Sequence, residues 1–301
     1  MELLSKDRVW IAWTGLETDL IFNQGVALAH FAAFPLVETE AGRDLLVRSY
    51  RELIGIGRDT GAGILLDTPT WMANPDRAAV LGYGPQDLTR ITRDAVALAF
   101  RVAREHPDVE TRVSVQIGPR GDGYQPGIAT AEAAAAYHAP QVEAARTAGA
   151  DLVSAYTLGA AGEAVGLSMA ARAAGLPALI SFTVETDGRL ADGMSLASAV
   201  SILAEEAPAA GIMVNCAHPD HIARALDGGS WQAHLCGIVA NASRKSHAEL
   251  DEATELDDGD PEEFGRQLGA LYRQMSGLRV LGGCCGTDAR HLRATARAAR
   301  G

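Results

Sequence analysis

Two adjacent cysteines, Cys284 and Cys285, occur in the segment VLGGCCGT, with glycines before and after them. Successive residues of a strand point to opposite faces, so neighbouring thiols normally diverge. Glycine tolerates positive φ, and we expect Gly282, Gly283 and Gly286 to curl the chain until both sulfurs face one point. Because a disulfide between neighbouring residues strains the peptide, a metal ion shared by two thiolates is the better explanation.

A third cysteine, Cys216, ends the aliphatic run GIMVNC. If this run and the run before Cys284 are strands of one parallel barrel, both end on the rim where barrel enzymes carry their chemistry. Three thiolates match the three protein ligands of a catalytic zinc site, which keeps a fourth position for substrate. Thiolates also favour zinc over magnesium. The alternative is buried cysteines that never meet.

Three other residues near these runs are weaker candidates for the metal. Cys236 starts its own run, so its thiol would lie roughly 16 Å below the rim, and we predict a small buried apolar residue. His218 and His221 follow Cys216 closely. Such histidines are more often found capping a helix start, and a metal role for His218 is left open.

Eight short aliphatic runs provide the elements that must position these thiols. In five of them a glycine precedes the run, as expected where a helix stops and a buried strand follows. The predicted strands lie near residues 9–13, 63–67, 112–117, 151–156, 178–183, 211–215, 235–240 and 278–282. Predicted helices between them include Asp87–Arg104, Ala129–Ala148, Ser195–Glu206 and Pro261–Met275, the last capped by Asp260. This alternation predicts a single-domain (β/α)8 TIM barrel, with a doubly wound open sheet as the alternative.

Composition excludes several classes of function. The 301 residues carry a net charge of −12 without a Lys/Arg cluster, which argues against nucleic-acid and anionic-membrane partners. No apolar run reaches the ~20 residues of a membrane span, and the N-terminus lacks the pattern of a secretory signal. Four cysteines are too few for a disulfide scaffold of this length. We therefore expect a cytoplasmic protein with reduced thiols.

Two motifs taken together, VNCAHP at 214–219 and GGCCGT at 282–287, resemble the zinc-dependent homocysteine S-methyltransferase family. Three further segments are similar to family segments: TGLETDL at 14–20 to DGGLGTEL, TPTW at 68–71 to TxTY, and SFTVETDGRLADG at 181–193 to SFT…GRLxDG. The resemblance covers nearly the whole chain. It implies one homocysteine-binding-type barrel domain over residues 1–301, with zinc held by Cys216, Cys284 and Cys285.

The resemblance also implies a mechanism. The sulfur of the acceptor binds zinc, which ionises the thiol without a general base, and then attacks a methyl donor. Asn241 in VANAS matches an asparagine that serves some members as an exchangeable fourth zinc ligand. Asn215 matches the asparagine before the first zinc cysteine and is expected to orient the site.

Two positions depart from the family pattern. Trp13 stands where the family has an Asp at the end of strand one, and Tyr156 stands where it has a Glu at the end of strand four. Both carboxylates that pair with the ammonium group of homocysteine are therefore missing, and a buried ammonium without a partner is costly. Either other acids replace them, or the acceptor is a different thiol.

Three acids lie just beyond predicted strands one, two and five, and they are candidates for this replacement: Glu17, Asp67 and Glu185. The alternative for each is a solvated charge on the rim.

The methyl donor is expected to be a sulfonium such as S-methylmethionine or S-adenosylmethionine. Only a short segment follows Cys285, which leaves no room for a cobalamin-binding module. Trp13, Trp71 and Tyr156 fall at the upper ends of strands one, two and four, and aromatic faces attract such cations. The alternative is that these rings pack under loops.

The sequence thus predicts a zinc-dependent thiol S-methyltransferase that converts homocysteine to methionine, in methionine biosynthesis. Its expected partners are a small-molecule thiol acceptor and a methyl donor, and a homo-oligomer is left open. One alternative is methylation, or reversible demethylation, of a different thiol or selenol. The alternative of another class is a zinc-binding barrel without catalysis.

Overall fold

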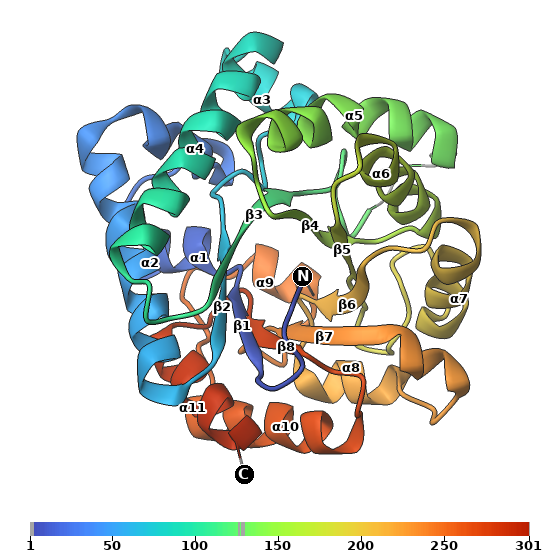
Figure 1. The fold of residues 1–301 in the computed structure, drawn as a ribbon. Coiled ribbons are helices and arrows are strands. Elements are labelled where there is room, and N and C mark those ends of the chain that lie inside the picture. Colours follow the sequence, from blue (N-terminus) through green and yellow to red (C-terminus); the bar gives the residue numbers. More distant parts are fainter. Residues whose placement is uncertain (1–2, 126, 128–129, 301) are drawn as a thin grey trace.

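Eight parallel strands close into one barrel in the order of the chain, and helices surround it (Figure 1). The computed structural model describes residues 3–125, 127 and 130–300. The strands are β1 Trp10–Trp13, β2 Gly63–Asp67, β3 Thr111–Ile117, β4 Leu152–Leu158, β5 Ala178–Phe182, β6 Gly211–Asn215, β7 Leu235–Ala240 and β8 Val280–Gly283. The predicted (β/α)8 barrel is confirmed, and the open sheet is excluded.

The α-helices and three short 3₁₀ turns fill the connections. The α-helices are α1 Leu16–Phe22, α2 Glu40–Thr60, α3 Pro75–Val80, α4 Pro85–Glu105, α5 Ala131–Ala148, α6 Ala161–Ala174, α7 Leu196–Glu206, α8 Pro219–Ala225, α9 His247–Asp251, α10 Pro261–Gln274 and α11 Ala289–Arg300. The 3₁₀ turns are Ala29–Phe31, Phe34–Glu38 and Ser230–His234. As predicted, Asp260 caps α10, since its side chain accepts hydrogen bonds from the backbone N–H groups of Glu262 and Glu263. Residue 129, where a helix was expected to begin, lies outside the described residues.

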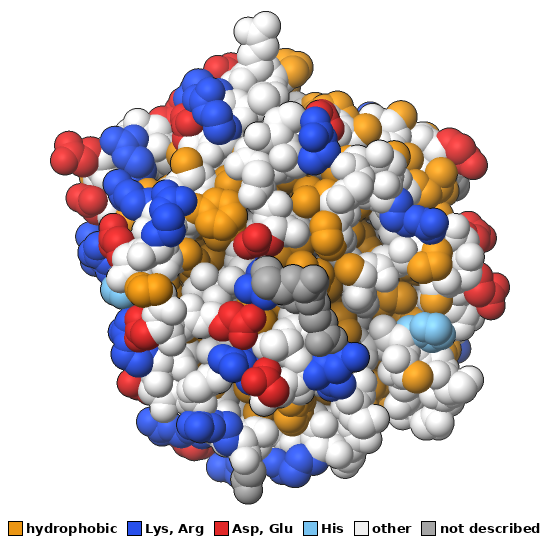
Figure 2. Space-filling view, in the orientation of Figure 1, with side chains coloured by type: hydrophobic (Ala, Val, Ile, Leu, Met, Phe, Trp, Pro, Cys, Tyr) orange, Lys and Arg blue, Asp and Glu red, His pale blue; other side chains and the backbone are white. Residues whose placement is uncertain are grey.

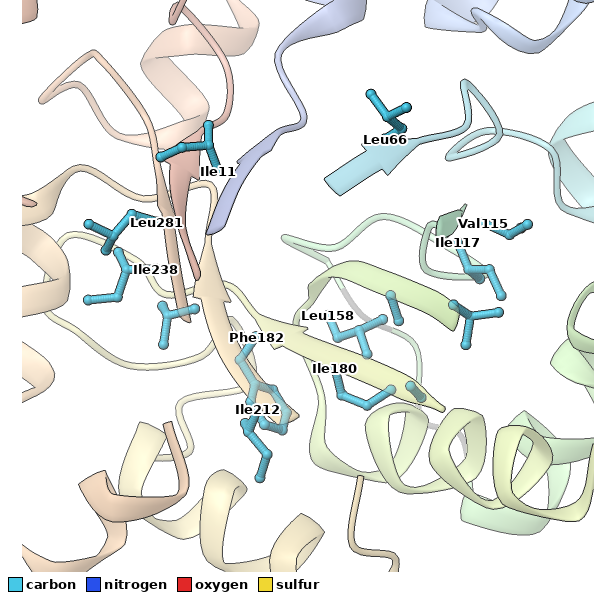
Figure 3. Close-up of a cluster of buried hydrophobic side chains, with 14 of the residues drawn as sticks. Ile11, Leu66, Val115, Ile117, Leu158, Ile180, Phe182, Ile212, Ile238 and Leu281 are labelled. Carbon is cyan, nitrogen blue, oxygen red and sulfur yellow. The ribbon is translucent and has the colours of Figure 1, made fainter. Parts of the chain in front are cut away.

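Two apolar layers hold the barrel, because alternate residues of each strand face opposite sides. Figure 3 shows the layer between the strands and the helices, with Ile11, Leu66 and Ile180 among its members. The inner layer fills the barrel itself and contains Trp10 and Tyr156, together with two of the cysteines. The cysteines therefore sit at the boundary between a dry interior and the rim.

The glycines before the cysteines act differently from the prediction. Gly282 and Gly283 belong to β8, and only Gly286 takes a positive φ, of 78°. A Cβ on Gly282 would collide with the backbone of Ala12, and one on Gly283 with the side chain of Thr287. These two glycines thus permit close packing beneath the site, and the positive-φ turn of the backbone follows the cysteines, at Gly286.

The opposite end of the barrel is closed by the N-terminal segment, which lies over the centre of the ring in Figure 1. Leu3 and Leu4 there line a cavity with Cys236. On the same face, acidic and basic side chains are interspersed rather than gathered by sign (Figure 2). None of the helices in the described part of the chain combines the length and the apolar character needed to cross a bilayer.

Candidate active site

Three sulfurs converge at the ends of β6 and β8, the strands that flank β7. The Sγ atom of Cys216 lies 2.9 Å from that of Cys284 and 3.7 Å from that of Cys285. All three sulfurs lie within 4.8 Å of one another. In a tetrahedral site with Zn–S bonds of ~2.3 Å, sulfurs are roughly 3.8 Å apart. The predicted cluster is therefore present: the separation of Cys216 and Cys285 matches that of sulfurs sharing an ion, and Cys216 and Cys284 lie closer together.

The backbone bends sharply to bring Cys216 into this cluster. Cys216 has a φ of 55° and Thr157, at the end of β4, has a φ of 65°. Left-handed conformations are unfavourable for residues other than glycine and persist only where the surroundings enforce them. Here Asn215 supplies that restraint: its Oδ1 accepts from the backbone N–H of Thr157, and its Nδ2 donates to Thr157 Oγ1. Asn215 Nδ2 also lies 3.9 Å from the sulfur of Cys284.

Crowding sets the ionisation of the thiols. Burial and the neighbouring sulfurs raise the pKa of Cys284 well above that of an ordinary thiol. Hydrogen bonds from Cys216 and Cys284 lower the pKa of Cys285. Thiolates this close repel one another, so all three ionise together only when a cation shares them. The donor set therefore fits a soft divalent cation such as zinc.

Asn241 follows the end of β7 and is buried beside the cluster. Its Nδ2 donates to the carbonyl oxygen of Cys216 at 3.1 Å, while its Oδ1 is buried without a hydrogen-bond partner. A buried amide oxygen without a partner is uncommon and costly. This oxygen is thus available to a ligand at the cluster.

A cavity of about 160 Å³ opens beside Cys216 and Cys285. Its wall is partly aromatic or apolar and partly acidic, and the lining includes no lysine or arginine. The lining residues are Thr18, Phe22, Phe31, Tyr124, Cys216, Asn241, Ser243, His247, Leu250, Asp251, Ala253, Glu255, Leu256, Asp257, Cys285 and Gly286. Much of this wall comes from the segment between β7 and α10.

His247 joins this segment to the cluster. Its Nε2 lies 2.7 Å from the carbonyl oxygen of Cys216, and its Nδ1 lies 3.1 Å from Glu185 Oε1. Tyr124 stacks on the ring, with centroids 3.5 Å apart. Both ring nitrogens of His247 are thus engaged by oxygen atoms. The Glu185 carboxylate is therefore engaged by His247, and Glu185 does not line the cavity.

Asp67 and Tyr156 form a pair inside the barrel. The Tyr156 hydroxyl donates to Asp67 Oδ2 at 3.1 Å, and Asp67 Oδ1 is buried without a partner. Burial raises the pKa of Asp67 to about 7. Asp67 is thus no solvated rim charge, but the pair lies outside the lining of the cavity.

The two tryptophans predicted to bind substrate also lie outside that lining. Trp13 packs against the layer beneath the helices, and its Nε1 donates to the carbonyl oxygen of Thr287. Trp71 donates to the carbonyl oxygen of Tyr156 and has the Arg77 guanidinium 5.2 Å from its ring centroid. One cation therefore already occupies a position over Trp71.

The weaker metal candidates have other roles. His218 caps α8, because its Nδ1 accepts from the backbone N–H of Asp220, and burial lowers its pKa to about 4. His221 lies on the same short helix. Cys236 lies at the start of β7 near Leu3, at the far end of the barrel, as predicted. The residue is partly rather than fully buried, which corrects the expectation.

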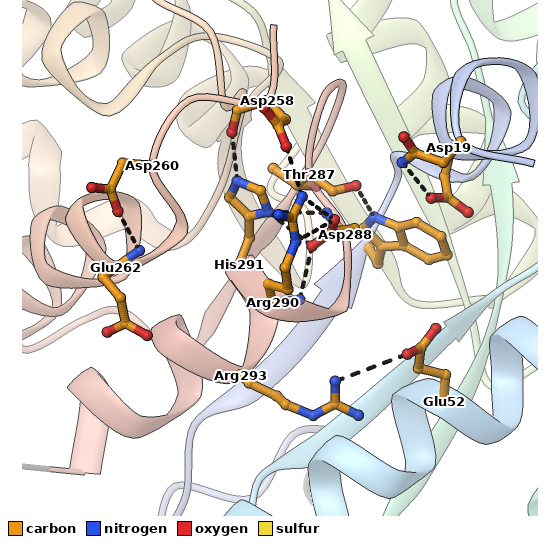
Figure 4. A network of polar contacts seen from close by, with 12 residues as sticks. Asp19, Glu52, Asp258, Asp260, Glu262, Thr287, Asp288, Arg290, His291 and Arg293 are labelled. Atoms are coloured by element: carbon orange, nitrogen blue, oxygen red, sulfur yellow. Dashed lines mark hydrogen bonds and ion pairs between the residues drawn. The ribbon is translucent and has the colours of Figure 1, made fainter. Parts of the chain in front are cut away.

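A polar network fixes the loop after the cysteines (Figure 4). Arg290 bridges Asp258 and Asp288, and His291 Nε2 bonds to the carbonyl oxygen of Asp258 at 2.8 Å. Thr287 Oγ1 donates to the carbonyl oxygen of Cys284. The start of α11, the cysteine loop and the segment that walls the cavity are thereby held together.

Sequence reasoning missed three residues at this site: His247, Tyr124 and Thr18. Weak signals for two of them exist. Ser246 and Glu249 form a capping box, the S-x-x-E pattern that predicts a helix start, and His247 lies inside it. Tyr124 is the aromatic residue of the glycine-rich segment GDGYQPG. Neither signal indicates contact with the cysteines, which depends on how the loops fold over the rim.

Comparisons with known proteins agree with this geometry. Two crystal structures of the homocysteine methyltransferase MmuM from Escherichia coli, in the metallated and oxidized forms, superpose with TM-scores of 0.72 and 0.73 at 25% and 26% identity. In both cases 98% of this chain and 96% of that chain are covered. No curated protein sequence matches the chain. The sequence model of the homocysteine S-methyltransferase family matches residues 36–299, so the chain belongs to this family of methyltransferases.

Proposed function

We propose that this protein is a zinc-dependent S-methyltransferase that methylates homocysteine to methionine from a sulfonium donor. The observation that carries the proposal is the convergence of three cysteine sulfurs beside a cavity that is lined by Cys216, Cys285 and Asn241, whose Oδ1 has no partner. A cytoplasmic setting suits such a site, since all four cysteines are free.

In the proposed site, Cys216, Cys284 and Cys285 would hold zinc, and Asn241 Oδ1 would be available as an oxygen donor to it. Bound zinc supplies the positive charge that lets a thiol ionise near neutral pH. Asn215 and His247 keep the backbone at Cys216 in its bent conformation, so the sulfur stays aimed at the cluster. The tetrahedral donor set leaves one position for substrate.

The wall of the cavity suits a cationic methyl donor. The side chains of Phe22, Phe31 and Tyr124 attract a sulfonium through their ring faces, and Asp251 and Glu255 add negative charge. In the transfer, a new bond forms between the acceptor sulfur and the methyl carbon. The bond from that carbon to the donor sulfur breaks, and its electron pair returns to the donor, which leaves as a neutral thioether. Aligning the two sulfurs is the main contribution of the cavity.

The test combines metal content with turnover. Purified protein should contain one zinc per chain and form methionine from homocysteine with S-methylmethionine or S-adenosylmethionine. Cys284→Ala and Cys285→Ala should lose both zinc and activity, because two thiolates do not complete the site. Cys236→Ala is the matched control, since its thiol lies at the other end of the barrel. It should keep zinc and activity.

Two results would contradict the proposal. Zinc-loaded protein that transfers no methyl group to any thiol in a panel of acceptors and sulfonium donors supports a barrel that binds zinc without catalysis. Full activity after removal of zinc, or in Cys285→Ala, would mean that the cluster has no part in the reaction.

A further inference from the structure

One buried carboxyl group beside the cluster has no part in the arrangement described so far. Glu17 is the second residue of α1, its side chain is only 4% exposed, and its Oε1 has no hydrogen-bond partner. The next residue, Thr18, lines the cavity.

In each of the other two candidate acids, one carboxylate oxygen is already engaged by another side chain. Glu185 binds the ring of His247, and Asp67 accepts the hydroxyl of Tyr156. By contrast, no lysine or arginine within the described ranges forms an ion pair with Glu17. Its carboxyl oxygens also lie outside the group of ligand atoms at the cluster, which comprises the three sulfurs alone. A positively charged group of a ligand would compensate a carboxylate at this position.

We infer that Glu17 binds the ammonium group of the acceptor and so gives this site its preference for an amino-acid thiol. The inference rests on the proposed function, which places the acceptor sulfur at the cysteines. A short aliphatic chain joins the sulfur and the nitrogen of homocysteine, so an anchor for the nitrogen must lie close to the cluster. Glu17 lies in α1, four residues after Trp13, which ends β1 in place of the expected acid. Its neighbour Thr18 lines the cavity together with Cys285.

A different role for Glu17 makes an opposite prediction. A buried acid that keeps its proton is a neutral hydrogen-bonding group and contributes nothing to the recognition of a cation. Glutamine has nearly the same shape and is neutral, so Glu17→Gln preserves that role and removes only the negative charge. The substitution thus separates recognition of the ammonium group from packing.

The experiment compares homocysteine with 4-mercaptobutyrate, the same thiol without the amino group. Binding to zinc-loaded protein is measured by calorimetry, and kcat/KM is measured with one sulfonium donor held constant. We expect Glu17→Gln to lower both the affinity for homocysteine and its kcat/KM by roughly 10- to 100-fold, which corresponds to the loss of one charge-assisted hydrogen bond. Binding and turnover of 4-mercaptobutyrate should be unchanged, and zinc content should stay at the wild-type value.

Asp19→Asn is the matched control on the same helix. The carboxylate of Asp19, labelled in Figure 4, lies at the surface and accepts hydrogen bonds from Asn23 and Gln24. This change should therefore leave the binding and turnover of both thiols unaffected. Glu17→Met, of similar length and also uncharged, provides a second variant if the amide disturbs folding.

Three outcomes overturn the inference. They are an equal loss for both thiols, no loss for either, and a homocysteine-specific loss in Asp67→Asn instead of Glu17→Gln. In each of these cases turnover by the wild-type protein leaves the proposed function standing. Wild-type protein that binds and methylates neither thiol would overturn both proposals.

Discussion

Replacing Asp67 by asparagine should make the folded protein more stable at alkaline pH. Asp67 is buried inside the barrel, and burial raises its pKa to about 7, against about 3.9 in an unfolded chain. Between these values the folded state holds a proton that the unfolded state has released. The free energy of unfolding of the wild-type protein therefore falls as pH rises through this interval. An asparagine side chain does not titrate, so the Asp67→Asn variant lacks this loss.

The size of the effect follows from the shift. The contribution of Asp67 to the free energy of unfolding changes by ~1.4 kcal/mol for each pH unit over which this side chain is ionised only in the unfolded chain. From pH 5 to the folded pKa near 7, the wild-type protein should lose about 3 kcal/mol relative to the variant, with little further change up to pH 8. Asparagine keeps an oxygen that can accept from the Tyr156 hydroxyl, so that hydrogen bond should survive.

Urea unfolding at pH 5 and pH 8, at one ionic strength, measures the difference. Asp44→Asn, at an exposed position on α2, is the control. Its free energy of unfolding should equal that of the wild-type protein at both pH values. Parallel pH dependence of Asp67→Asn and the wild-type protein would refute the reasoning, because it would mean that Asp67 is solvated or already paired with a cation.

Three further predictions concern the site. Binding of homocysteine to zinc-loaded protein should release close to one proton per chain near neutral pH, measured by calorimetry in buffers of different ionisation enthalpy; binding without release would show that the thiol does not ionise there. Glu185→Gln should lower the free energy of unfolding by about 1 kcal/mol, because the partly exposed carboxylate of Glu185 holds the ring of His247. Zinc content should stay constant, and loss of zinc would contradict this role. Tyr156→Glu should place a second buried carboxyl group beside Asp67, so the melting temperature of this variant should fall more between pH 5 and pH 8 than that of the wild-type protein, because two adjacent carboxylates repel each other. An equal fall would contradict the contact between the two side chains.

The strand pattern and the cysteine motifs were readable from the sequence because both are local. Glycines such as Gly61, Gly149 and Gly175 end helices in the left-handed conformation, and buried strands follow them. Parallel strands of one barrel necessarily end on the same rim, which brings Cys216 to Cys284 and Cys285 across a separation of 68 residues. The metal site therefore followed from residue types and spacing, and the reaction type from the resemblance of the two cysteine motifs to the family.

The tertiary structure alone decided which acids are free. Glu17, Asp67 and Glu185 look equivalent in the sequence, since each follows a strand end. Glu185 is engaged because the segment between β7 and α10 folds over the rim and brings His247 to it. Asp67 is engaged because strand register sets it opposite Tyr156 inside the barrel. Partners of this kind are distant in the chain, and no periodic pattern encodes them, so only the folded barrel separates Glu17 from the other two.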